Sequence, residues 1–225
     1  MSVDLVGTTH TPVPLDGLVL AAEETLARLL GLTAAPVLDV IADRRIEQGR
    51  VVEPGRRLSR RERGTELIGE RVGGSELIAE RVGGSDDERT GARDLDFLVA
   101  GYEDIVRLLV FDPDEVPAQE GHVAADGQRE PVEAVFSPSR TCVGVVTATA
   151  LALAVADLGG GEFVDAEIRM LPSREPHPGR MIERTGLPDR GDDFTARCAR
   201  FMRQFARLND WPRTVRQPPG RQAAP

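Results

Sequence analysis

The sequence predicts an α+β fold, in which an antiparallel sheet packs against two or three helices of a single domain. Three observations carry this prediction. The chain has 225 residues and 40% hydrophobic content, enough for one buried core. Apolar residues recur at helical spacing over 17–30 and 138–158. Short segments between these helices alternate apolar and polar residues as strands do, over 36–43, 95–99 and 131–137.

The first helix follows a short strand over residues 3–6. Its apolar stripe consists of Leu18, Val19, Ala22, Leu26, Leu29 and Leu30. Asp16 is placed to cap this helix and Gly31 to end it. Residues 36–43 then alternate as a strand, and the turn-like "EQGR" leads to a second extended piece, "VVE". The simplest prediction for this region is a hairpin.

Residues 54–93 differ in composition from the rest of the chain. "GRRLSRRERG" is charged and irregular, and two decapeptides follow it, "ELIGERVGGS" over 66–75 and "ELIAERVGGS" over 76–85, which match at nine of ten positions. Two short copies cannot build the core of a solenoid. We therefore predict a tandem duplication within a low-order charged insertion, outside the core of a single domain over 1–213. A partner-binding arm is the alternative.

The second half is expected to begin with the strand over 95–99. A short helix over 105–109 is predicted next, ending before Pro113. Two further extended pieces, over 121–127 and 131–137, are expected to form a hairpin or an edge pair.

The most apolar stretch of the chain is 142–156, fifteen uncharged residues that are mostly Ala, Val and Leu. Ser137 or Ser139 can cap a helix here, and Pro138 can occupy its first turn. A bilayer span takes about 20 apolar residues. The stretch therefore predicts a buried central helix.

Three glycines end this helix in "LALAVADLGGGEFVD", where "GGGEF" differs by one letter from the "GGDEF" signature of cyclic-dinucleotide synthases. Glycine is the residue best able to end a helix in the left-handed conformation. Residues 163–170 then alternate as a strand. A phosphate-binding loop has the reverse order, strand before helix, and no lysine is present to grip a nucleotide. We expect a helix cap and a strand, without cyclase activity or guanine-nucleotide binding.

The last helix is predicted over 193–208, with Asp192 as its N-cap and Pro212 beyond its end. Its apolar stripe consists of Phe194, Cys198, Phe201, Met202, Phe205 and Leu208. Four arginines fall mostly on the outer face: Arg197, Arg200, Arg203 and Arg207. A nucleic-acid face is the alternative, but no exposed aromatics interleave with them, which favours a solvated face. Residues 214–225 form a Pro-rich polar tail, predicted to be disordered.

Composition excludes several kinds of chemistry and partner. The chain carries 37 acidic and 28 basic residues and a net charge of −9, so neither nucleic acid nor a membrane is expected as a partner. All basic residues are Arg, which rules out a Schiff-base or P-loop lysine. The three histidines and two cysteines show no metal or disulfide spacing, so no metal, cofactor or catalytic residue is predicted. Without signal-peptide features, a cytoplasmic location is expected.

The central Ala/Leu-rich helix, "GGGEFVDAEIRML", the Arg/Phe helix and the closing "WP" resemble a group of small actinobacterial proteins of unknown function. "LALAVADLGGGEFVD" is also similar to the helix, Gly-Gly, acidic-strand segment of immunity proteins that neutralise secreted polymorphic toxins. The resemblance covers about 95–213 and transfers no catalytic residue. It implies a protein that binds and blocks a toxin domain.

The sequence thus favours a non-catalytic binding protein. We expect its partner to be a basic protein, because a chain of net charge −9 is steered toward positive surfaces. Glu162, Asp165 and Glu167 are the predicted partner-binding residues, gathered at one strand. A small enzyme with a site assembled from distant residues, or a regulatory or structural subunit, are the alternatives.

Overall fold

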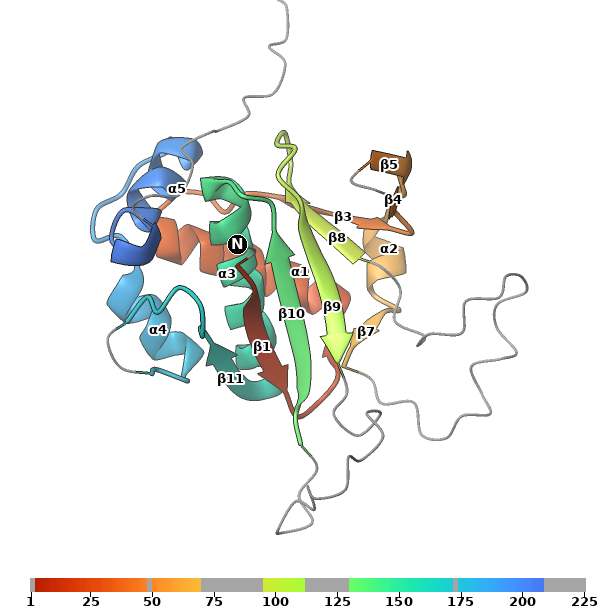
Figure 1. The fold of residues 1–225 in the computed structure, drawn as a ribbon, viewed down its shortest axis with the longest axis horizontal. Coiled ribbons are helices and arrows are strands. Elements are labelled where there is room, and N and C mark those ends of the chain that lie inside the picture. Colours follow the sequence, from red (N-terminus) through yellow and green to blue (C-terminus); the bar gives the residue numbers. More distant parts are fainter. Residues whose placement is uncertain (1–2, 48–49, 70–94, 112–129, 172–173, 209–225) are drawn as a thin grey trace, which may run out of the picture.

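The computed structural model of the chain describes residues 3–47, 50–69, 95–111, 130–171 and 174–208. Its centre is a seven-stranded antiparallel sheet with the strand order β11-β1-β10-β9-β8-β3-β6, and helices cover one face of this sheet (Figure 1). The predicted α+β class is therefore confirmed.

Seven strands build the main sheet: β1 (Leu5–Thr9), β3 (Leu38–Ala42), β6 (Arg56–Arg57), β8 (Leu95–Val99), β9 (Val106–Phe111), β10 (Val132–Pro138) and β11 (Gly160–Val164). Two small sheets lie beside it: β2 (Val13–Pro14) with β7 (Leu67–Ile68), and β4 (Arg45–Glu47) with β5 (Arg50–Glu53). The helix-facing side chains alternate with outward ones, as Leu108 opposite Phe136 and Leu109 opposite Val135 illustrate. This alternation gives the sheet one buried and one outer face.

The two longest helices lie on that buried face. They are α1 (Leu15–Leu30) and α3 (Cys142–Gly159), which pack against each other, and α3 lies on β1 and β10 (Figure 1). Beside them, α4 (Pro178–Thr185) and α5 (Phe194–Met202) pack against α1 and α3, and a short 3-10 helix (Ala206–Leu208) follows. A single turn of helix, α2 (Arg60–Arg63), lies near α1.

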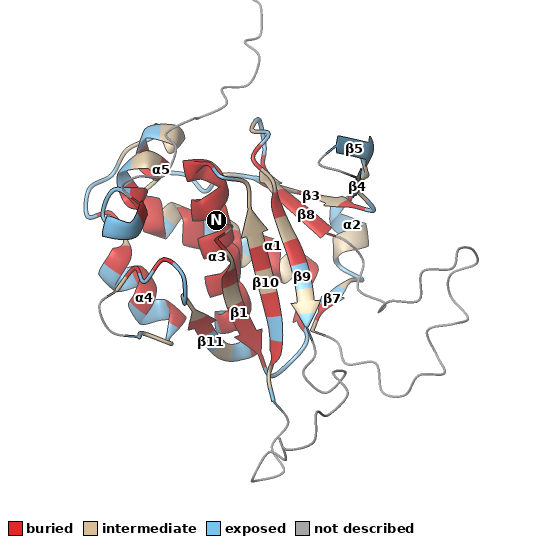
Figure 2. Cartoon of the chain, in the orientation of Figure 1, coloured by how far each residue is buried: buried red, intermediate tan, exposed pale blue. Residues whose placement is uncertain are grey.

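Helix α3 is the core of the molecule. It is long and apolar enough to cross a membrane by length and composition alone, but 89% of its 18 residues are buried inside the fold (Figure 2). This burial agrees with the predicted central helix. The predicted caps differ: Thr141 is the N-cap and accepts a hydrogen bond from the backbone N–H of Gly144 at 3.0 Å, whereas Ser137 and Pro138 belong to β10.

One hydroxyl in α3 gives a stability prediction. Thr147 is fully buried, and its Oγ1 has no hydrogen-bond partner among the described residues. Because valine has nearly the same shape without the desolvated hydroxyl, we expect Thr147→Val to raise the free energy of unfolding by about 1 kcal/mol, measured by urea denaturation. Thr149→Val is the matched control, since the Thr149 hydroxyl donates to the Val145 carbonyl oxygen at 2.8 Å. Equal stability of the two variants would contradict the prediction.

Helix α1 ends as predicted, but it begins differently. Gly31 is in the left-handed conformation with φ 59° and caps the C-terminus. Pro14 precedes the first residue without a side-chain cap, and Asp16 lies inside the first turn. There its carboxylate pairs with Arg60 at 3.4 Å and Arg63 at 3.7 Å, so it ties α2 to α1.

Two predicted elements between 36 and 111 are wrong. The predicted helix over 105–109 is strand β9, because a segment this short has apolar positions that fit either period and the neighbours β8 and β10 supply strand partners. The predicted hairpin of 36–43 with the extended piece near Val51 is wrong, because β5 pairs with β4, whereas β3 pairs with β8 and β6.

The first part of the predicted insertion belongs to the fold. Leu58 and Ile68 are buried in the core, and Ser59 and Glu62 form a reciprocal capping box on α2. Hydrogen bonds from Ser59, and then from Arg56, lower the pKa of Glu62 to about 2. The prediction of a low-order insertion outside the core is therefore wrong for residues 54–69. Residues 70–93 lie outside the described residues.

Candidate functional site

The glycines of "GGGEF" join the core helix to the edge of the sheet. Gly160 has φ 65° and caps α3, as predicted, and a Cβ there would meet open space. A Cβ on Gly159 would overlap the Thr9 side chain, and one on Gly161 would overlap the backbone carbonyl of Thr8. Gly160 thus caps the helix, and Gly159 and Gly161 on either side of it lie in close contact with β1.

Strand β11 is shorter than the predicted strand over 163–170, and it ends at Val164. The chain then turns around Asp165, whose carboxylate accepts backbone hydrogen bonds from Ile168 at 2.9 Å, Arg169 at 2.9 Å and Met170 at 2.6 Å. Side-chain hydrogen bonding of this kind competes with strand pairing. The turn also holds Arg169 in the left-handed conformation, with φ 53°.

The three predicted partner-binding residues consequently do not share one strand face. Glu162 is exposed on β11 and forms an ion pair with Arg174. Asp165 has its carboxylate directed into the turn, and Glu167 is exposed, with one carboxylate oxygen accepting the backbone N–H of Asp4 at 3.2 Å. Glu162 and Glu167 therefore retain carboxylates that reach the surface, whereas Asp165 shapes the loop.

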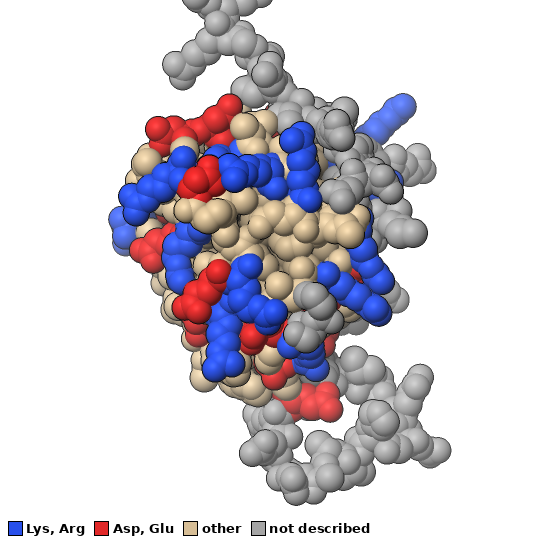
Figure 3. Space-filling view, turned by 90° about the vertical axis from the view of Figure 1, so that its left-hand side faces the viewer, with Lys and Arg blue, Asp and Glu red and all other residues tan. Residues whose placement is uncertain are grey.

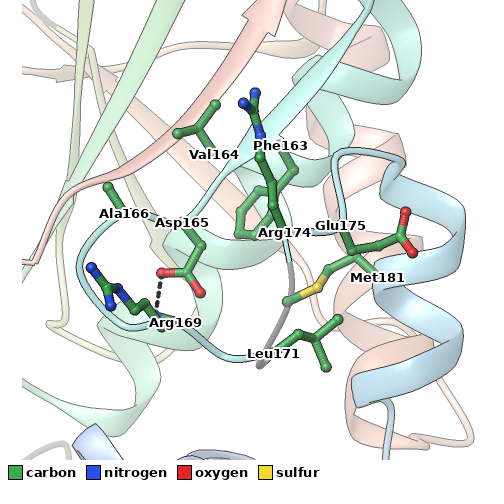
Figure 4. Close-up of a pocket in the computed structure, with 9 residues that line it drawn as sticks. All are labelled: Phe163, Val164, Asp165, Ala166, Arg169, Leu171, Arg174, Glu175 and Met181. Atoms are coloured by element: carbon green, nitrogen blue, oxygen red, sulfur yellow. Dashed lines mark hydrogen bonds between the residues drawn. The ribbon is translucent and has the colours of Figure 1, made fainter.

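A cavity of about 400 Å³ opens beside this turn, between the end of β11 and the start of α4 (Figure 4). Its apolar lining residues are Phe163, Val164, Ala166, Leu171 and Met181. Its charged lining residues are Asp165, Arg169, Arg174 and Glu175. Phe163 and Met181 are 2% exposed and belong to the core, so the floor of the cavity is rigid and apolar. A hydrogen bond from Phe163 N to the carbonyl oxygen of Pro176, 3.0 Å, fixes the far wall to β11.

Most of the charged groups around the cavity are engaged within the fold. Arg174 pairs with Glu162, and the Glu175 carboxylate lies 3.5 Å from the Arg184 guanidinium. In Figure 4 the charged ends of Arg174 and Glu175 point away from the hollow, and the Met181 side chain points toward it. The hollow is therefore apolar inside and charged at its rim.

Sequence reasoning missed Leu171, Arg174, Glu175 and Met181, because it assigned no helix between residues 170 and 193. The signal was present: Pro178 lies at the start of α4, and the buried residues Met181, Ile182 and Thr185 follow at helical spacing. The cavity itself could not be read from the sequence, since it depends on how α4 lies against β11.

Three buried titratable groups away from the cavity, Cys142, Cys198 and Asp96, have structural surroundings. Burial raises the pKa of the Cys142 thiol and, more strongly, that of Cys198, so both remain protonated and poor nucleophiles. Asp96 is 1% exposed and pairs with Arg107 at 3.1 Å and Arg44 at 3.5 Å. The two cysteines therefore act as apolar core residues. The Asp96 carboxylate is neutralised by two guanidinium groups.

The histidines and acidic residues form no metal-binding arrangement within the described ranges. His10 is exposed, and His177 is exposed at the N-cap of α4 without a side-chain cap bond. His122 lies outside the described residues. Among the described residues, the cavity beside β11 is therefore the best-defined candidate site.

Comparison with known proteins identifies no relative in which this cavity could be compared. The predicted resemblance to immunity proteins remains a prediction, and function is inferred from the residues of this chain. No family model, no curated protein and no solved structure matches the chain.

Proposed function

We propose that the protein is a non-catalytic binding protein whose partner inserts an apolar side chain into the cavity beside β11. The observation that supports this is that both carboxyl groups lining the cavity are already held by hydrogen bonds or an ion pair within the fold. Asp165 accepts three backbone hydrogen bonds, and Glu175 faces Arg184. A general acid or base needs a carboxyl group free to exchange a proton with a substrate. An apolar hollow with a charged rim suits the anchor residue of a protein interface better.

The partner that we propose is a basic toxin domain, which the protein neutralises by direct binding. The net charge of −9 supports attraction to a positive protein surface, and the exposed carboxylate of Glu162 is on the cavity side of the molecule, because it pairs with Arg174 of the cavity lining. Figure 3 faces that side and shows arginine and acidic side chains interleaved around an uncharged area. A mixed rim of this kind selects a partner by charge pattern and anchor shape together.

The test is binding to the protein encoded directly upstream, because an immunity gene follows the gene of its toxin. Ala166 lines the cavity and is exposed, so Ala166→Phe fills the mouth without entering the core. We expect this variant to lower the affinity at least about tenfold, measured by calorimetry. Ala100→Phe is the matched control, since Ala100 is exposed in the turn after β8 and does not line the cavity.

A second measurement on the same complex tests the carboxylates. The double variant Glu162→Gln, Glu167→Gln is expected to slow association at low salt and to weaken its salt dependence, because rim charges act mainly on the association rate. If wild type binds no such partner, the binding-protein proposal loses its support. If it binds and Ala166→Phe behaves like Ala100→Phe, the cavity is not the interface.

A further inference from the structure

The outer face of the main sheet carries a row of apolar side chains. Val164, Val6, Val135 and Leu109 follow one another across β11, β1, β10 and β9, as the strand pairs Val164–Val6, Val6–Val135 and Val135–Leu109 show. None of the described helices covers β1, β10 or β9 on this side, and Figure 1 views it with α1 and α3 behind the sheet. We infer that this row is the interface between two copies of the chain. Only Val164 also lines the cavity, so this interface goes beyond the proposed function and does not depend on it.

This apolar row differs from the usual solvent-facing side of a sheet. An antiparallel sheet with one buried face normally places polar residues on its other face. Here Leu109 is 38% exposed, and Phe111, two residues further along β9, is 51% exposed. The three valines of the row are partly exposed. A contiguous apolar patch with a polar rim is typical of an interaction surface.

The two sides of the row carry opposite charges at β9 and β10. On one side Glu133 is exposed, and within the described residues its carboxylate forms no ion pair or hydrogen bond. On the other side Arg107 and Arg44 share the single carboxylate of Asp96, which leaves one positive charge. The row therefore has an acidic flank and a basic flank in this half of the sheet.

A two-fold axis along the row makes these flanks complementary between two copies. Such an axis places the row of one copy on the same row of the other, exchanges the two flanks, and keeps the strands of the two sheets aligned. Glu133 is paired with Phe111 across the strands on one flank, and Ser137 with Arg107 on the other. The axis therefore brings Arg107 of one copy to Phe111 and Glu133 of the second copy. There its guanidinium can stack on the ring and bind the carboxylate.

Sedimentation velocity of the full chain, from about 1 to about 200 µM, tests the apolar row. We expect the wild type to be a dimer in the upper part of this range. Leu109→Glu should raise the dissociation constant of the dimer at least about tenfold, because each copy would then bury a carboxylate in the apolar row. Leu20→Glu is the matched control and should leave the constant unchanged, since Leu20 is 44% exposed on α1, behind the sheet.

The charged flanks are tested by Glu133→Arg, which places a second guanidinium near Arg107 of the other copy. We expect the dissociation constant to rise at least about twofold, and more at low salt than at high salt. Glu24→Arg makes the same change of charge at an exposed position of α1 and is the control. Should Leu109→Glu fail to fold, as judged by circular dichroism, Glu133→Arg and its control decide the matter.

A wild type that stays monomeric at about 200 µM would overturn the inference. So would a dimer that Leu109→Glu leaves intact, or one that Leu20→Glu weakens equally. If the wild type is monomeric and Leu109→Glu instead lowers the affinity for a partner protein, the outer face belongs to that partner and not to a second copy. If the dimer forms as expected and no partner protein binds, the proposed function falls and the dimer interface stands.

Discussion

Gly161→Asp, which converts "GGGEF" to "GGDEF", is expected to destabilise the protein severely. A Cβ at this position would overlap the backbone carbonyl of Thr8 on the neighbouring strand, so β11 and β1 could not remain paired. The two strands cannot move apart locally, because Phe163 of β11 is part of the core. We expect a loss of at least about 3 kcal/mol, which for a domain of this size lowers the melting temperature by about 6–12 °C.

The matched control for Gly161→Asp is Gly160→Asn. Gly160 has a positive φ, but a Cβ there meets nothing within 4 Å, and asparagine tolerates the left-handed conformation better than other side chains. Its cost should stay within about 1 kcal/mol. Thermal unfolding followed by circular dichroism compares the two. A Gly161→Asp protein as stable as Gly160→Asn would show that the strands are not in close contact, and would reopen the comparison with the cyclase signature.

The elements that the sequence predicted well are those whose signals are local. The left-handed glycine caps at Gly31 and Gly160 follow from the absence of a Cβ, and the burial of α3 follows from fifteen uncharged residues in a row. In strands β8 and β10 every second residue from Leu95 to Val99 and from Val132 to Phe136 is apolar and buried, which is the spacing of one buried sheet face. In these cases local preference and global packing agree.

The failures have a common physical origin in contacts between distant residues. Strand β9 exists because β8 and β10 flank it, although its spacing also fits a helix. Ile68, at the start of the duplicated decapeptides, is buried because β7 pairs with β2. Pairing partners this far apart in the chain leave no trace in a short window of sequence.

The candidate site shows the same limit. Glu162 was identified from its place beside the glycines, and the cavity does lie at that end of β11. The role of Asp165 was not predictable from alternation, because a carboxylate that captures three backbone N–H groups bends the chain out of the strand. Arg169 lines the cavity as a result of that turn, with its guanidinium directed away from the hollow (Figure 4), and strand periodicity does not predict this position.

Arg197→Leu is the other substitution with a large expected effect. The sequence placed Arg197 on the solvated face of the last helix, which is wrong, since its side chain is 7% exposed. Its Nε donates to the carbonyl oxygen of Leu30 at 2.5 Å, one of its terminal nitrogens lies 3.0 Å from the Asp189 carboxylate, and the other donates to the Asp189 carbonyl oxygen. One guanidinium thus closes the C-terminus of α1 and fixes the loop before α5.

Removing this guanidinium leaves the buried Leu30 carbonyl oxygen without a donor, so we expect Arg197→Leu to lose about 2–4 kcal/mol in urea denaturation. Arg197→Lys should recover little of it, because an ammonium group cannot reach all three acceptors in one plane. Arg200→Leu is the control: Arg200 is half-exposed and, among the residues that the structure describes, bonds only to the Asp189 carboxylate, at 2.6 Å, so its loss should cost under about 1 kcal/mol.

The pH dependence separates the two arginines further. Desolvation raises the pKa of the Asp189 carboxyl, but the hydrogen bonds from Arg200 and Arg197 outweigh it, and the pKa lies below its ordinary value. A lowered pKa stabilises the fold above the ordinary carboxyl pKa, and this stability fades as the pH falls through the folded-state value. The Leu30 contact does not titrate, so most of the Arg197→Leu deficit should persist in acid, whereas the smaller Arg200→Leu deficit should vanish there. If Arg197→Leu and Arg200→Leu are equally stable at neutral pH, the buried contact to α1 contributes nothing beyond a surface ion pair.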